Sequence, residues 1–244
     1  MPIHKIAIIA EAEQGRLHPA ILDLAALVER LSENGPVEVR WLVVGSQAAE
    51  AGARLAKDTG YSVTALAIPP AVALTGELVC DVLHPLLTDM QPNIVALLHT
   101  SRSQDYAATL AITFDAAYIT GVQGLGMQDG TPVYQRAVFG GKWMIEIQTD
   151  DRPVVLTVLP GYFKFEGNSS KSAEVDICRP SLPVTRTQLI EIRESGTEAA
   201  LAQAETIVAA GRGSIESKLR AFAAANIPVA AVPDEVVELV KAAL

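Results

Sequence analysis

The chain has 244 residues, of which 50% are hydrophobic, so it can bury a sizeable core and is not intrinsically disordered. Its 19 basic and 28 acidic residues give a formal charge of −9, which opposes binding to a phosphate backbone and excludes nucleic acid as an expected partner. Cys80 and Cys178 stand far apart and form no C-x-x-C, which excludes a disulfide framework, a zinc site and an iron–sulfur cluster and favours a reduced, cytoplasmic setting.

The first apolar run, from Ile6 to Ala10, is short and is followed by Glu11 and Glu13. A membrane span needs about 20 apolar residues, and a signal peptide needs an apolar core of about 7–15. The run therefore predicts a buried strand, and we expect no membrane insertion.

Up to residue 116, short apolar runs rich in β-branched residues alternate with longer amphipathic segments. Continuous apolar strands are typical of a parallel sheet covered on both faces, and strand–helix alternation favours right-handed crossovers. We expect a Rossmann-like, doubly wound α/β fold with a mostly parallel sheet. The predicted strands are 5–10, 37–44, 62–68 and 93–98, and the predicted helices are 18–34, 47–59, 75–89 and 104–114.

The pattern then changes to strands separated by turn residues, without helices. The predicted strands are 117–125, 132–139, 142–149 and 153–159. We expect them to extend the sheet through antiparallel hairpins. The three glycines at 121, 124 and 126 precede strands rather than a helix, so turns or bulges are a better interpretation than a dinucleotide fingerprint.

The remainder of the chain divides into two predicted parts. Residues 161–195 are rich in Ser, Lys, Glu and Pro and predict an irregular arm or linker. Residues 196–244 regain a short α/β pattern that is too small for an independent core and is expected to pack on the first domain, 1–160, or on a partner. Its predicted helices are 196–204, 214–225 and one from Asp234, with strands at 204–210 and 227–232.

Two loops are candidate anion sites. The loop 99–105 follows a parallel strand, where backbone N–H groups and Arg102 can hold an anion, but it also fits an ordinary helix start capped by Ser103. Gly211-Arg212-Gly213-Ser214 lies between a predicted strand and a helix, where glycine allows close approach of a phosphate, and a structural turn is the alternative.

The charged and aromatic residues around the predicted hairpin have two possible roles. Arg136, Lys142, Trp143 and Arg152 fall around it and fit either a docking surface or the charges that commonly protect a strand edge. No nucleophile motif, P-loop or H-E-x-x-H occurs, so whether the protein is an enzyme stays open and an independent small-molecule enzyme ranks lowest.

Three segments together resemble the electron transfer flavoprotein alpha subunits. IAIIAEAEQGRL, from Ile6, is similar to that family's opening strand and A-E-H-x-x-G-x-L, with Ala12 where histidine is common. Ala137–Phe163 matches its glycine turn, hairpin and V-x-T-V-x-P/R-G-x-F strand end, and 205–213 is similar to its A-x-x-I/V-V-S-G-G-R-G. The resemblance implies a cytoplasmic heterodimer with a beta-type subunit, with FAD as cofactor and a dehydrogenase or quinone reductase as redox partner.

The segment 196–244 then reads as a remnant of the family's FAD domain. The family's middle motifs are missing, and 227–239 is similar to its closing strand and helix, so FAD is expected to be bound weakly or shared with the partner. Arg212 and Asp234 match positions that contact FAD; with the glycine loop, the predicted cofactor-binding residues are Gly211, Arg212, Gly213, Ser214 and Asp234. The alternative is a flavin-free homologue that acts as an assembly module or binds an adenine nucleotide such as AMP.

Overall fold

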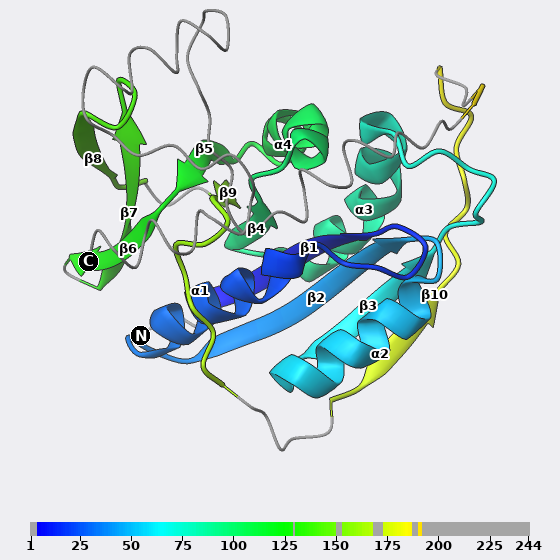
Figure 1. Ribbon diagram of the computed structural model, residues 1–244, viewed down its shortest axis with the longest axis horizontal. Helices are drawn as coiled ribbons and strands as arrows, with labels where there is room; N and C mark the ends of the chain where they lie inside the picture. The colour runs from blue at the N-terminus through cyan, green and yellow to red at the C-terminus, as the bar shows by residue number, and fades with distance from the viewer. Residues whose placement is uncertain (1–3, 129, 150–152, 168–172, 187–189, 192–244) are drawn as a thin grey trace, which may run out of the picture. The chain divides into compact units, whose positions relative to one another are not determined.

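The fold is that of a computed structural model, which describes residues 4–128, 130–149, 153–167, 173–186 and 190–191 (Figure 1). Two compact units divide the chain, residues 1–190 and 191–244. The helices and strands of the described residues all lie in the first unit.

The centre of the first unit is a parallel sheet of seven strands in the order β10-β3-β2-β1-β4-β9-β5 (Figure 1). All of its strand pairs are parallel, and the central strands are apolar along almost their whole length because helices cover both faces. The strands are β1 (His4–Ala12), β2 (Val37–Gly45), β3 (Ser62–Ala67), β4 (Ile94–Leu98), β5 (Ala117–Val122), β9 (Val154–Val158) and β10 (Val175–Cys178).

The helices form one layer on each face of this sheet (Figure 1). Alternate residues of β1 divide between two cores: Ile6 and Ile8 pack with the first helix layer, and Ala7 and Ile9 pack with the second. The first layer is η1 (Pro19–Leu22), α1 (Asp23–Ser32) and α2 (Ala48–Thr59), and the second is α3 (Gly76–Met90) and α4 (Ser101–Thr113). The predicted doubly wound, Rossmann-like fold is confirmed.

A separate three-stranded antiparallel sheet holds β6 (Gly124–Gln128), β7 (Thr131–Val138) and β8 (Trp143–Ile147) in that order. The predicted antiparallel hairpins are confirmed, but they form a sheet of their own, and the prediction that they extend the main sheet was wrong. The predicted strand 117–125 divides at Gln123, where β5 leaves the parallel sheet after a register shift that includes Gly121, whose φ is +63°. The predicted strand 153–159 becomes β9, inserted in parallel between β4 and β5.

The segment 161–195, predicted to be an irregular arm, contains a strand, and this part of the prediction was wrong. β10 pairs in parallel with β3, and the Arg40 Nη1 to Asp176 Oδ2 ion pair of 2.8 Å ties it to β2. β10 has only four residues and lies at the sheet edge, so its own sequence carries almost no periodic signal.

Among the described residues, no helix is both long and apolar enough to cross a bilayer.

Candidate functional site at the switch point of the parallel sheet

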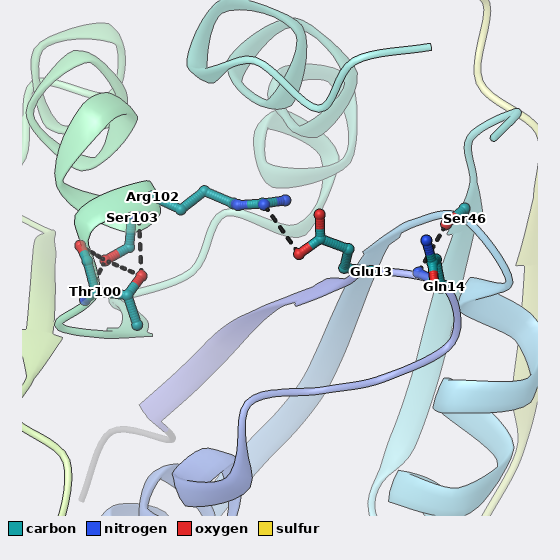
Figure 2. Close-up of polar contacts among 6 residues, drawn as sticks. All are labelled: Glu13, Gln14, Ser46, Thr100, Arg102 and Ser103. Carbon is teal, nitrogen blue, oxygen red and sulfur yellow. Dashed lines mark hydrogen bonds and ion pairs between the residues drawn. The ribbon is translucent and has the colours of Figure 1, made fainter. Parts of the chain in front are cut away.

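The winding of the sheet reverses at β1. From β1 the chain adds β2 and β3 on one side, and then returns to add β4 on the other. Neighbouring loops diverge at such a point, and ligands of open α/β sheets bind there, outside the carboxyl ends of the strands. The residues that follow β1, β2 and β4 therefore form the candidate site (Figure 2).

The loop after β1 is held against the end of β2. Gln14 N donates to Ser46 Oγ at 3.0 Å (Figure 2). Gly15 N donates to the Ser46 carbonyl at 3.2 Å. At Gly45, whose φ is +141°, a Cβ would lie 2.0 Å from the Ala12 carbonyl oxygen. Only glycine permits this approach, so the β1 and β2 ends form one fixed wall of the site.

The start of α4 forms the opposite wall, and its cap is Thr100. Ser103 N donates to Thr100 Oγ1 at 3.1 Å, and Thr100 N donates to Ser103 Oγ at 3.0 Å, which is a reciprocal capping box (Figure 2). The predicted capped helix start is confirmed, but the cap lies three residues before the predicted Ser103. That side chain is instead buried inside the first turn.

Arg102, the predicted anion ligand, reaches from α4 to the loop that follows β1. Its Nη2 lies 3.2 Å from Glu13 Oε2, and the two side chains are 35% and 69% exposed (Figure 2). An ion pair as exposed as this contributes little to stability, about 0–1 kcal/mol. The ion pair instead lowers the attraction of this site for an anion, because the Arg102 guanidinium already faces the Glu13 carboxylate.

A second carboxylate, Glu11, lies deeper and accepts a hydrogen bond from the buried Tyr106 hydroxyl on α4. Burial raises the pKa of Glu11, and the Tyr106 hydrogen bond and the Arg102 charge partly oppose that rise. Burial and the neighbouring Glu11 carboxylate hold the pKa of Tyr106 well above its usual range, so Tyr106 stays a neutral donor.

The charges nearest to Arg102 disfavour phosphate. When ionised, Glu11 and Glu13 place two negative charges beside Arg102, and the first N–H groups of α4 are partly used by its own cap. This arrangement opposes the phosphate of an adenine nucleotide such as AMP at the switch point.

His99 belongs to a partly buried hydrogen-bond chain that also includes Thr157 and Gly121. Its Nδ1 lies 2.8 Å from Thr157 Oγ1, and Gly121 N donates to that same hydroxyl at 3.1 Å. Burial, and secondly the charge of Arg136, lower the pKa of His99. A neutral imidazole that accepts from Thr157 at Nδ1 fits both observations, so His99 joins β4 to β9 and β5 as a structural residue.

Replacing Thr157 by valine is expected to lower the free energy of unfolding by about 1.5 kcal/mol, because the Gly121 N–H loses its buried acceptor. Chemical denaturation measures the loss. Thr109→Val, the same substitution at an exposed position of α4, is the control and should change stability by less than about 0.5 kcal/mol. Equal losses in the two variants would show that the Thr157 hydroxyl is not used in this way.

The antiparallel sheet carries an exposed apolar surface, here called the β8 surface: Phe139, Trp143, Met144 and Ile145. Every residue from Trp143 to Glu146 is exposed, Trp143 by 67%, and Phe139 in the preceding turn is 80% exposed with an unusual φ of +52°. Among the described strands β8 pairs only with β7, so no described strand covers its other edge. Such an apolar, open edge favours a docking surface over simple solvation.

The residues predicted around this hairpin have different roles. Trp143 and Lys142 are exposed at β8 and its turn, whereas Arg136 donates from Nη1 to Thr120 Oγ1 at 2.6 Å and so joins β7 to β5. Arg152 lies outside the described residues. The prediction missed Phe139, Met144 and Ile145, although a continuous apolar run beside a Gly-Gly turn was the available signal.

The predicted cofactor-binding residues Gly211, Arg212, Gly213, Ser214 and Asp234 all lie outside the described residues. The predicted elements of 196–244 lie there as well.

Comparison with known proteins gives one family. The model of the electron transfer flavoprotein domain matches residues 6–181. The chain is 25% identical to the electron transfer flavoprotein subunit alpha of Methylophilus methylotrophus, over 86% of this chain and 65% of the relative. It is 24% identical to the subunit of that name in Syntrophomonas wolfei, over 52% and 41%, and 25% identical to the protein FixB of Rhizobium meliloti, over 84% and 62%. The chain therefore spans less than two thirds of the length of these relatives.

Proposed function

The chain belongs to the electron transfer flavoprotein family, and from this premise we propose that it is an alpha-type subunit that transfers electrons on FAD together with a beta-type subunit. In this proposal the heterodimer is cytoplasmic and takes electrons from, or passes them to, a dehydrogenase or quinone reductase. Bound FAD supplies the chemistry, which is reversible uptake and release of electrons.

The observation that carries the partner proposal is the β8 surface. Large apolar side chains are gathered there on one short strand, and that strand has an open hydrogen-bonding edge. A partner strand that pairs with such an edge gains main-chain hydrogen bonds, and the flanking apolar side chains supply the buried area. A beta-type subunit is the occupant that family membership supports.

The proposed place of FAD is the 211–214 loop with Asp234, because the switch-point crevice is a poor host for a pyrophosphate. There Glu13 pairs with Arg102, and Glu11 lies close to the same guanidinium. At the glycine loop, by contrast, Arg212 matches a family position that contacts FAD, and its guanidinium is suited to bind phosphate oxygens in pairs.

Replacing Arg212 by alanine is expected to weaken FAD binding by about 1–3 kcal/mol, the scale of a lost charge-assisted hydrogen bond. Fluorescence titration of the heterodimer with FAD measures this change. Arg220→Ala removes the same charge eight positions further on and is the control, with an expected change below about 0.5 kcal/mol. An unchanged affinity in the Arg212 variant would mean that the glycine loop is only a turn.

The test of the function as a whole is the visible absorption spectrum of the full chain, purified alone and after co-expression with a beta-type subunit in the presence of FAD. We expect a yellow heterodimer from which chromatography releases FAD, and weaker or no colour in the chain alone. Colourless protein in both preparations would reject the flavoprotein role and favour the alternative, a flavin-free assembly or nucleotide-binding module.

A further inference from the structure

A cavity lies at the end of the sheet opposite to the switch-point site, near the amino ends of β4 and β9. Its volume is about 390 Å³, within the range of about 300–1,000 Å³ typical of small-molecule sites. The last turns of α3 and α4 form two of its sides, and Pro92 and Pro153, which precede β4 and β9, contribute a third. Neither the crevice nor the β8 surface shares a residue with it.

The floor of this cavity is apolar, and its rim is polar. Leu87, Pro92, Val95 and Val155 are buried in the floor. Phe114 forms part of the wall, with its ring stacked on His84 at a centroid distance of 5.5 Å. The polar rim residues are His84, Thr88, Gln91, Thr113 and Asp115. An apolar floor with a few convergent polar groups is the usual construction of a site for a small organic ligand.

The charges at the rim determine whether the cavity favours a cationic or an anionic ligand. The carboxyl ends of α3 and α4, which carry partial negative charge, both border the cavity. Asp115 adds a full negative charge, and its carboxylate forms no ion pair with another described residue. The cavity lining contains neither Lys nor Arg among the described residues. A cation is therefore attracted and an anion repelled.

The two helices end at the rim of the cavity. Gln91 and Asp115, the residues beyond or near the two helix ends, both adopt left-handed conformations, with φ of 49° and 46°. This is a common way to end a helix, and the Gln91 N–H donates to the Leu87 carbonyl at 2.9 Å. In each case the conformation turns the chain at the cavity mouth, directly before a strand or its leading segment.

We propose that this cavity binds an organic ammonium ion, with its apolar body on the Leu87–Val155 floor and its charged nitrogen beside Asp115 and the two helix ends. The inference does not depend on the flavoprotein role, because it rests on a cavity that no part of that role uses.

Isothermal titration calorimetry of the full chain with matched probes tests this inference. The probes are phenethylammonium chloride, 2-phenylethanol and sodium phenylacetate, which share an aromatic body and differ in charge. We expect the ammonium ion to bind about tenfold more tightly than the alcohol, and phenylacetate to show no binding. Equal affinity for ammonium and alcohol, or no heat from ammonium up to about 10 mM, would overturn the inference.

Three variants locate the binding. Asp115→Asn should weaken ammonium binding about threefold and leave 2-phenylethanol unaffected. Asp89→Asn removes an exposed carboxylate of α3 that does not line the cavity, and it should change neither affinity. Thr88→Trp, at an exposed rim position, should obstruct the mouth and weaken both probes. If Asp89→Asn matched Asp115→Asn, the attraction would be that of the whole acidic protein and the assignment to this cavity would fail.

Discussion

Replacing Trp143 by alanine is expected to weaken binding of a beta-type subunit by about 3 kcal/mol, roughly 150-fold, because a central aromatic anchor of an interface carries this much of the affinity. The isolated chain should keep its stability, since 67% of Trp143 is exposed and few core contacts are lost. Calorimetry with the purified beta-type subunit measures the affinity, and denaturant titration of the chain alone measures the stability.

The matched control for Trp143 is Ile112→Ala on α4, which removes an apolar side chain that is 82% exposed and lies outside the β8 surface. Binding should be unaffected by it. Two outcomes would contradict the prediction: a Trp143 variant that binds as tightly as the parent chain, or an Ile112 variant that loses as much affinity. Unchanged binding by the Trp143 variant would favour the alternative that the hairpin residues only protect a strand edge.

Replacing Tyr106 by phenylalanine is expected to lower the free energy of unfolding by about 3 kcal/mol at pH 8, because the partly buried Glu11 carboxylate then loses its hydrogen-bond donor. The ring is kept, so the packing of α4 against the sheet is largely preserved. Tyr118→Phe, at a half-buried tyrosine of β5, is the control for loss of a hydroxyl. A cost at Tyr106 no greater than that control would show that the hydroxyl does not support Glu11.

The pH dependence of this pair has a defined sign. Burial raises the pKa of Glu11 in the folded chain above its unfolded value, so the folded state binds more protons between the two pKa values. The contribution of Glu11 to stability is therefore complete below the unfolded pKa and is lost as the pH rises through the folded pKa. Glu11→Gln, which cannot ionise and still accepts from Tyr106, should be more stable than the parent chain at pH 8 and equal to it below about pH 4.

Denaturant titrations of the parent chain and the Glu11→Gln variant across that pH range measure the difference. A variant that is less stable than the parent chain at pH 8 would mean that the ionised carboxylate is stabilised in the fold, with Arg102 outweighing burial. The Tyr106→Phe loss should also shrink as the pH falls, because a protonated Glu11 needs a donor less.

The local signals of the sequence predicted most of the parallel core. Apolar runs such as Ile6–Ala10 and 93–98 can be satisfied only when both faces are covered, and the amphipathic segments between them supply that cover. The helix 104–114 was predicted to start three residues late, because Ser103 and Thr100 both suit a cap and only the reciprocal bonds of the fold distinguish them. The role of Glu11 could not be predicted from the residues that follow the first apolar run, because its partner Tyr106 is 95 residues away.

The sequence by itself determined the fold class and the likeness to a flavoprotein family, because each depends on periodicity or on motifs within a short stretch of chain. Only the tertiary structure decided which strands pair: it inserted β9 beside β4, set β6–β8 apart and added β10 at the edge. Strand pairing joins residues far apart in sequence, and a strand of four or five residues carries the same local pattern whichever neighbour it meets. The open β8 edge and the Glu11–Tyr106 pair follow from those pairings.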